Sequence, residues 1–358
     1  MIVVVGAGPV GLTAALALAK RGFAVTVLEA GDGLAAESRA STFHPPTLSM
    51  LKELGVLPQL MARGLISPTF AYRDRHGLIA ELDLGLLKDD TPYPYRVQCE
   101  QSKLTPILLE HLLAHDNCEV RFGWPVAAVN GSTVSTADGR EVTADWVIAA
   151  DGAHSAVRRS LGVAFDGITY PERFLVASTD EELDGLALVN YVFDPVEWAV
   201  LLRTPDHWRV LLPTPEDTPD EAELARLGQR LQGIRDFGRP WRVAHASIYR
   251  VHQRVAATFQ VGNVLLAGDA AHVNNPLGGL GMNSGIHDAI AYAQAFPDLG
   301  EVPQQRRRVA LDFVRRVSHT NWERMRDPAA HLAGIREMAA DPVKARQYLL
   351  RTSMLRHD

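Results

Sequence analysis

The stretch IVVVGAGPVGLTAALALAK, residues 2–20, decides the fold. It opens with a continuous apolar run at 2–5, which is typical of a strand buried on both faces. An Ala- and Leu-rich segment at 12–20 then predicts a helix, and a second apolar run at 24–28 predicts another strand. The three segments together predict a βαβ unit with parallel strands.

The turn between this strand and helix carries the pattern G-x-G-x-x-G. Gly6 permits a tight turn, Gly8 lets the backbone approach a pyrophosphate, and Gly11 lets helix and strand pack closely. Val10 lies within the same turn. Glu29 ends the second strand, where its carboxylate can accept hydrogen bonds from ribose hydroxyls. We therefore expect these five residues to bind a dinucleotide, and the turn alone leaves NAD and FAD open.

A second glycine-rich stretch, GDAAHVNNPLGGLGMNSGIHDA at 268–289, follows an apolar run at 262–267 that predicts a buried strand. Asp269 lies at the end of that strand, where open α/β sheets bind ligands, and it can hydrogen-bond a second ribose or a ribityl chain. A helix is predicted to begin near Ser284, so backbone N–H groups face out of the loop and suit an anionic planar group. A reduced flavin carries negative charge near N1 and the C2 carbonyl, which favours FAD. The cofactor contacts expected in this loop are Pro276, Gly281, Met282 and Asn283.

Three segments in this order resemble the FAD-dependent aromatic hydroxylases of the para-hydroxybenzoate hydroxylase type. The resemblance implies that Arg39 and Gln98 contact the flavin. The segments are GAGPVG with Glu29, DWVIAADGAHSAVRRSLG at 145–162 and GDAAHVNNPLGGLGMNSG at 268–285, supported by ESRAST at 37–42 and YRVQCEQSKL at 95–104.

The middle segment places Asp151 and Gly152 directly after an apolar run at 146–150. The resemblance associates this Asp-Gly motif with FAD and with the passing nicotinamide cofactor. An alternative stays open, in which Asp151 merely caps a helix and Arg158 is a solvated surface charge. His272 in the third segment is expected to be a structural histidine.

The resemblance implies an α/β fold, with a Rossmann-like FAD-binding domain, an inserted β-sheet substrate domain and a helical C-terminus. From Val309 on, the sequence predicts helices that are interrupted at Pro328 and Pro342. The expected boundaries are 1–70, 97–164 and 260–290 for the discontinuous FAD-binding domain, 71–96 and 165–259 for the substrate sheet, and 291–358 for the C-terminal helices.

A β-hairpin is predicted inside the substrate region. The runs WAVLLR at 198–203 and WRVLLP at 208–213 flank a four-residue loop that begins at Thr204. The favoured interpretation of Arg203 is that it only stacks on the neighbouring Trp208. The polar groups available to orient or deprotonate a phenol are Tyr191, Arg203, His207 and Arg209.

The resemblance implies a single-component monooxygenase. NAD(P)H would reduce FAD, oxygen would form a flavin C4a-hydroperoxide, and its distal oxygen would attack an electron-rich carbon of a small aromatic or polycyclic substrate. No second dinucleotide fingerprint occurs in the chain, so NADPH or NADH is expected to bind transiently to the flavin domain. No catalytic side chain is assigned, because the cofactor supplies the chemistry.

Other functions remain open at this point. The main alternative is an FAD-dependent reductase or epoxidase that acts on a non-aromatic double bond. A flavin halogenase is disfavoured because none of the six Trp residues lies in a Trp-x-Trp-x-Ile-Pro pattern. An FAD-binding protein without turnover is the non-enzymatic alternative. The sequence leaves open the substrate, the position of hydroxylation, the choice between NADPH and NADH, and the oligomeric state.

Composition excludes several partners. The 358 residues carry a formal net charge of −6, which offers no basic field for nucleic acid. Two cysteines, Cys99 and Cys118, build no disulfide framework and lack metal-ligand spacing, so no metal and a reducing cytoplasm are expected. No apolar run of about 18 residues or more predicts a membrane span.

Overall fold

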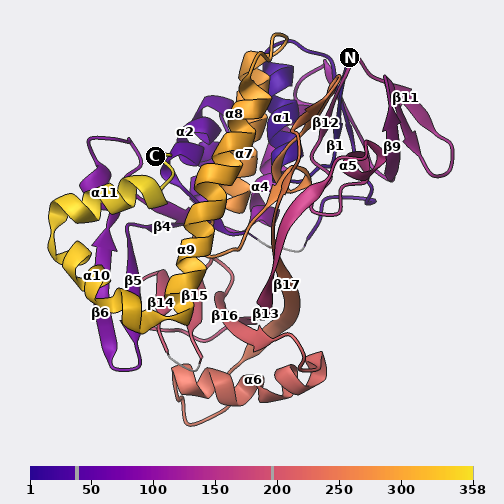
Figure 1. Cartoon of the computed structure of the whole chain (residues 1–358). Coiled ribbons are helices and arrows are strands. Elements are labelled where there is room, and N and C mark those ends of the chain that lie inside the picture. The colour runs from indigo at the N-terminus through magenta and orange to yellow at the C-terminus, as the bar shows by residue number, and fades with distance from the viewer. Residues whose placement is uncertain (37–39, 195–196, 358) are drawn as a thin grey trace.

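A six-stranded sheet forms the centre of the first half of the computed structural model, which describes residues 1–36, 40–194 and 197–357 (Figure 1). Neighbouring residues of its β1 face opposite sides: Val4 packs among helices, whereas Val3 packs against a three-stranded sheet. Burial on both faces therefore confirms the apolar run as a central strand. The strand order is β18 (Gln260–Val261), β19 (Val264–Leu266), β12 (Trp146–Ala149), β1 (Ile2–Val5), β2 (Val25–Leu28) and β8 (Cys118–Arg121), with only β18 antiparallel.

Helices cover one face of this sheet and a small meander covers the other (Figure 1). The helical layer contains α1 (Pro9–Lys20), α2 (Pro45–Leu54), α3 (Leu57–Arg63), α4 (Gln101–Leu113) and α7 (Gly281–Ala295). The opposite layer contains β9 (Val126–Asn130), β10 (Thr133–Thr136), β11 (Glu141–Thr143) and the short α5 (Ala156–Ser160).

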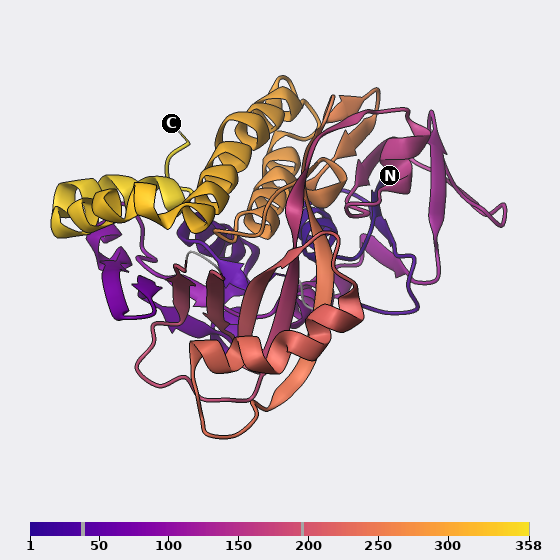
Figure 2. The same ribbon diagram turned by 60° about the horizontal axis from the view of Figure 1, so that its bottom comes forward.

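An eight-stranded sheet forms the second half, and helix α6 (Asp220–Ile234) crosses one of its faces (Figure 2). The predicted hairpin is confirmed, because β15 and β16 pair with Arg203 opposite Trp208. The strand order is β20 (His272–Val273), β17 (Val243–Ala256), β13 (Phe165–Thr179), β16 (Trp208–Pro215), β15 (Ala199–Arg203), β14 (Val189–Val192), β5 (Thr69–Asp74) and β6 (Gly77–Asp83).

A short third sheet connects the two halves. Its strands are β3 (Thr42–Phe43), β7 (Arg96–Gln98) and β4 (Leu65–Ser67), with β7 in the middle. Because β4 leads almost directly into β5, residues of this sheet lie between the helical layer and the eight-stranded sheet.

The C-terminal helices close over the face of the eight-stranded sheet that α6 leaves uncovered, where Ile335 and Leu349 enter the core (Figure 1). The predicted interruptions at Pro328 and Pro342 are confirmed, since each proline begins a new helix. The elements are α8 (Val302–Val309), a π-helical turn (Ala310–Val314), α9 (Arg315–Arg326), α10 (Pro328–Ala340) and α11 (Pro342–Thr352).

Two helix starts differ from the sequence prediction. Helix α1 begins at Pro9 instead of residue 12, because proline has no N–H to lose at a first helical position. Helix α7 begins at Gly281 instead of Ser284. Glycine is a poor helix former, but the buried Asn283 amide anchors this first turn to neighbouring backbone.

Two buried histidines join α2 to the segment around α7. His44 Nε2 lies 2.9 Å from the carbonyl oxygen of Gly278, and His287 Nε2 lies 3.0 Å from Thr47 Oγ1. Burial lowers the pKa of His287 to about 3, with a further lowering from Arg306, and it lowers the pKa of His44 well below its usual value. Both imidazoles are therefore neutral in the folded protein near neutral pH.

We expect acidification to destabilise the fold through these histidines. The unfolded chain takes up a proton at His287 near the ordinary pKa of 6.5, whereas the folded chain does not until about 3. This contribution to the free energy of unfolding is complete above pH 6.5 and is lost as the pH falls towards 3, by about 2 kcal/mol at pH 5. Urea unfolding between pH 7.5 and 5 should give a shallower dependence for His287→Gln than for the wild type. The exposed-site variant His76→Gln is the control, and equal slopes for all three proteins would contradict the assignment.

Candidate cofactor and substrate site

In the first glycine-rich turn, a side chain at Gly6 or Gly11 would collide with backbone, whereas a side chain at Gly8 would not. Gly6 has φ +104°, and a Cβ there would lie 2.5 Å from the Ala150 carbonyl oxygen. A Cβ on Gly11 would lie 1.9 Å from the Gly6 carbonyl oxygen. A Cβ on Gly8 would meet no atom within 4 Å, although Gly8 is the N-cap of α1. The tight turn and the close packing are thus present, and the space over Gly8 faces the N-terminus of a helix, where anions bind.

The Glu29 carboxylate hydrogen-bonds the backbone beside this turn. Its Oε2 accepts a hydrogen bond from the Ala7 N–H at 2.7 Å, and its Oε1 accepts one from the Gly31 N–H at 2.9 Å. The carboxylate therefore lies beside the glycine turn, as its position at the end of the second strand predicts.

Val10 brings the second glycine loop against the first. A Cβ on Gly268 would lie 2.9 Å from Val10 Cγ2, and a Cβ on Gly285 would lie 2.6 Å from the same methyl. Only glycine at both positions lets α7 and the 268–270 turn approach α1 this closely. Asp269 is exposed in that turn.

Asp288, a buried residue of α7, anchors the second glycine-rich loop. Its carboxylate accepts from the Gly268 N–H at 3.1 Å and contacts His272 Nε2 at 2.8 Å and Arg306 Nε at 2.7 Å. Burial acts to raise the pKa of Asp288, but Arg306 and His272 outweigh it, so the net pKa is lowered. His272 therefore has the structural position predicted for it.

The loop that precedes α7 is braced by Asn283. The Asn283 side chain accepts from the His44 N–H at 2.9 Å and donates to the carbonyl oxygens of Thr42 at 2.8 Å and Gly279 at 2.7 Å. The Asn283 amide is therefore engaged by the protein, and a cofactor contact at this position would use its backbone N–H. The backbone N–H groups of Gly281, Met282 and Asn283 begin α7, and such groups have no partner within a helix.

Two predicted cofactor residues have buried polar atoms without a protein partner. Gln98 Oε1 accepts from Thr42 Oγ1 at 2.9 Å, while its Nε2 has no hydrogen bond. Asp151 Oδ2 accepts from the Val157 N–H at 3.1 Å, while its Oδ1 has no partner. Unsatisfied buried groups are costly, so each atom suits a ligand contact. Arg39 lies outside the described residues.

The structure agrees with one part of the capping alternative and contradicts the other. Asp151 does bond to the first turn of α5, as the capping alternative requires. Arg158 is not a solvated charge, however, because it is 5% exposed and donates to the carbonyl oxygens of Ala270 and Ala153. Its guanidinium joins the middle segment to the second glycine loop.

Three of the four polar groups named for the substrate, Tyr191, Arg203 and Arg209, lie in different places. Tyr191 is 8% exposed and lines a cavity. Arg203 shares the α6 face of the hairpin with Leu201, pairs with Glu182 and lies outside the cavity lining. Arg209 lies on the opposite face, close enough to Tyr249 and Glu100 to interact with their charges, but outside the cavity lining. A strand alternates its faces, and only the position of α6 shows which face is covered.

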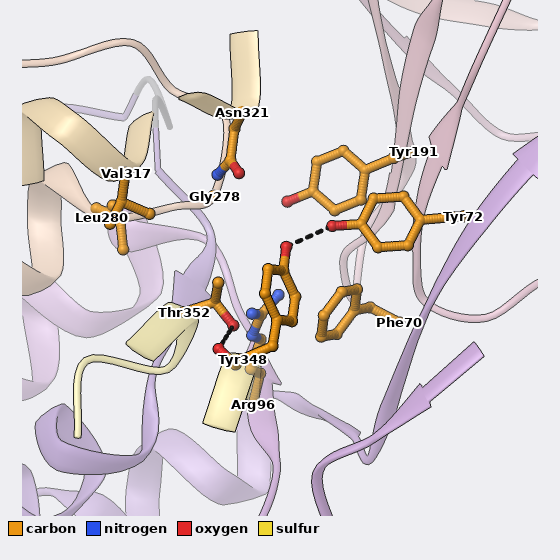
Figure 3. A pocket seen from close by; sticks show the side chains of 10 residues that line it. All are labelled: Phe70, Tyr72, Arg96, Tyr191, Gly278, Leu280, Val317, Asn321, Tyr348 and Thr352. Atoms are coloured by element: carbon orange, nitrogen blue, oxygen red, sulfur yellow. Dashed lines mark hydrogen bonds between the residues drawn. The ribbon is translucent and has the colours of Figure 1, made fainter. Parts of the chain in front are cut away.

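The cavity lies where the second glycine loop, the eight-stranded sheet and the C-terminal helices meet (Figure 3). The hydroxyls of Tyr72 and Tyr348 lie 2.6 Å apart. Burial, with help from Tyr348 and Tyr191, raises the pKa of Tyr72 well above its usual value, so this hydroxyl stays protonated. The lining residues are Phe70, Tyr72, Arg96, Tyr191, Gly278, Leu280, Val317, Asn321, Tyr348 and Thr352.

Most of this lining was not predicted. Phe70 and Tyr72 point to one face because they are two positions apart in a strand, which a period-two pattern could have indicated. Arg96 is two residues before Gln98 in β7, so it shares that face of the strand. Nothing in the local sequence marks Tyr348 as a cavity residue.

Other kinds of site find no support in the part of the chain that the structure describes. None of its helices is long and apolar enough to cross a membrane. Over the same residues, no group of three or more His, Cys, Asp or Glu side chains could hold a metal ion.

A family model described as FAD binding domain matches residues 1–299. The chain belongs to this family. Para-nitrophenol 4-monooxygenase of Pseudomonas sp. (strain WBC-3) is 38% identical over 380 residues, covering 98% of this chain and 94% of the relative. The 6-hydroxy-3-succinoylpyridine 3-monooxygenase HspB of Pseudomonas putida is 40% identical over 304 residues, covering 81% and 77%. The crystal structure of p-nitrophenol 4-monooxygenase PnpA from Pseudomonas putida DLL-E4 matches with a TM-score of 0.92 at 36% identity, covering 98% and 96%.

These findings confirm the resemblance, the fold class and FAD as the cofactor. The protein is an FAD-dependent monooxygenase of the aromatic hydroxylase type.

Gly8 offers a test of cofactor placement that spares the fold. Because its added Cβ meets no protein atom and its φ is −73°, Gly8→Val should fold, and the thermal midpoint of the FAD-free protein should not change. The side chain should obstruct the pyrophosphate and weaken FAD binding about tenfold or more. Flavin absorbance after dialysis measures retention. Gly228→Val, also with no atom within 4 Å, controls for the added side chain, and full FAD content in Gly8→Val would contradict the placement.

Proposed function

We propose that the protein hydroxylates a small phenol, with NADPH or NADH as transient reductant and O2 as the source of the inserted oxygen atom. The observation that carries this proposal is the position of the aromatic cavity. Its open volume is about 10 Å³, which is room for one water molecule, so the lining side chains must move to admit a phenol. The cavity wall includes Gly278 and Leu280, and the chain continues from them directly into the first N–H groups of α7 at 281–283. A relative that matches nearly the whole chain is named for para-nitrophenol, which supports a phenol of similar size.

The two glycine loops are proposed to hold FAD at its two ends. The pyrophosphate would lie over Gly8 at the N-terminus of α1, with Glu29 and Asp269 accepting from ribose and ribityl hydroxyls. The unpartnered Gln98 Nε2 and Asp151 Oδ1 would complete the contacts. The isoalloxazine ring would lie along Pro276 to Asn283 and so face the cavity. The proposed FAD domain spans 1–70, 97–164 and 260–290, and the substrate sheet 71–96 and 165–259.

The chain's own residues would position the substrate and keep water out. Bound FAD supplies the redox chemistry with oxygen. Burial raises the pKa values of Tyr72 and Tyr191, so both stay neutral and can donate hydrogen bonds to the oxygen of a phenol. Phe70, Leu280 and Val317 supply an apolar wall that excludes water. The chain has no second G-x-G-x-x-G pattern, which supports transient binding of the hydride donor to the same domain. We place the reaction in the cytoplasm, where this reductant is available.

Replacing either proposed ribose contact should weaken FAD retention. Asp269→Ala removes an exposed acceptor and should cost about a tenfold loss in FAD affinity. Glu29→Ala should lose at least as much, because it also frees the Ala7 and Gly31 N–H groups. Flavin absorbance after dialysis measures retention against Asp166→Ala, an exposed aspartate in β13. Retention equal to the wild type in both variants would refute the placement.

Turnover under oxygen-18 gas tests the reaction itself. A panel of phenols, quinolones and pyridines is first screened for compounds that accelerate flavin reduction by NAD(P)H. With an accelerating compound, mass spectrometry should show one labelled oxygen atom in the product for each NAD(P)H consumed. Unlabelled product with stoichiometric hydrogen peroxide would indicate an oxidase, and turnover without oxygen would indicate a reductase. Either result would overturn the proposed function.

A further inference from the structure

Arg96 is a buried cation at the wall of the cavity. It is 3% exposed, lies in β7 and lines the cavity beside Phe70 (Figure 3). Its guanidinium carbon is 4.5 Å from the centre of the Phe70 ring. An arginine stays charged in proteins, so this wall carries a full positive charge.

The Tyr191 hydroxyl hydrogen-bonds the Arg96 side chain, but it is neutral and does not balance the charge. Among the described residues, no ion pair involves Arg96, and its buried Nε has no hydrogen-bond partner. None of the cavity-lining residues is acidic. The aromatic face of Phe70 compensates only in part, and a buried charge without a counter-charge is costly.

The neighbours of Arg96 respond to its charge in a consistent way. His44 is buried nearby, and after burial itself the positive charge of Arg96 is the next cause that lowers its pKa. Tyr191 has a pKa raised by burial, and Arg96 opposes that rise because it favours negative charge on the hydroxyl. The field inside the cavity therefore favours an anionic oxygen placed next to Tyr191.

We propose that Arg96 binds an anionic oxygen group of the aromatic substrate and that the cavity selects substrates that carry such a group. This inference rests on the proposed function, since it names the charge class of that function's substrate. Two sources share the required chemistry, an ionised phenol and a ring carboxylate. An ionised phenol would gain most for the reaction, because its ring carbons are richer in electrons.

Binding to the FAD-loaded protein at pH 8, measured by calorimetry without NAD(P)H, tests the proposal. Two matched pairs are compared: 4-nitrophenol with 4-nitroanisole, which cannot ionise, and benzoate with benzamide. The wild type should bind the anionic member of one pair about tenfold or more tightly than the neutral member, and that pair identifies the source. Arg96→Met should abolish most of this preference and change the affinity for the neutral member little. Arg203→Met, on the α6 face of the eight-stranded sheet and away from the cavity, should keep it.

The thermal midpoint of Arg96→Met shows whether this variant folds. Because Arg96 has no counter-charge, replacing it with Met of similar length should not lower the thermal midpoint. If Arg96→Met does not fold, the wild type alone still decides. Its bound 4-nitrophenol should ionise at lower pH than free 4-nitrophenol, as read from phenolate absorbance, or its benzoate should bind about tenfold more tightly than benzamide.

Equal affinity for both members of each pair in the wild type would overturn the proposal, as would an unchanged preference in Arg96→Met. These measurements require no turnover. A failure of oxygen transfer would therefore contradict the proposed function without contradicting the preference for anions. Loss of the preference alone would contradict this inference without contradicting the proposed hydroxylation.

Discussion

The close approach of α1 and α7 is the constraint on which the site depends. Val10 packs against Gly268 and Gly285, and any side chain at either glycine would overlap a Val10 methyl. Gly285 also lies so near Gly268 that a Cβ there would be 2.9 Å from the Gly268 Cα. Asp288 then anchors the Gly268 N–H from within α7. Two loops more than 250 residues apart in sequence thereby meet at one edge of the sheet, where a single extended cofactor can span both.

Three unsatisfied buried atoms belong to residues proposed to contact the cofactor or the substrate. Gln98 Nε2, Asp151 Oδ1 and Arg96 Nε each lack a protein partner. Such a group costs about 1–3 kcal/mol when buried, and ligand contacts recover that cost on binding. The ligand-free protein is therefore less stable than it would be with these groups paired, and binding of the cofactor and substrate should stabilise it. This agrees with the general observation that functional sites are stabilised less than the rest of a protein.

Sequence patterns within short segments predicted the structural features that depend on those segments alone. The βαβ unit, the hairpin at Thr204 and the helix breaks at Pro328 and Pro342 follow from hydrophobic period, turn chemistry and proline geometry, and all are present. The cavity could not be predicted in this way, because Tyr72, Arg96 and Tyr348 come from three separate elements. Arg203 shows the same limit: alternation groups it with Leu201, but only the packing of α6 shows that this face points away from the cavity.

A crystal structure of the protein with FAD bound tests the central claim most directly, because the claim is one of position. We predict density for the pyrophosphate over Gly8 at the start of α1 and for the isoalloxazine ring along Pro276 to Asn283, with one ring edge open to the Arg96 cavity. FAD bound elsewhere on the sheet, or a flavin ring separated from that cavity by protein, would contradict the account.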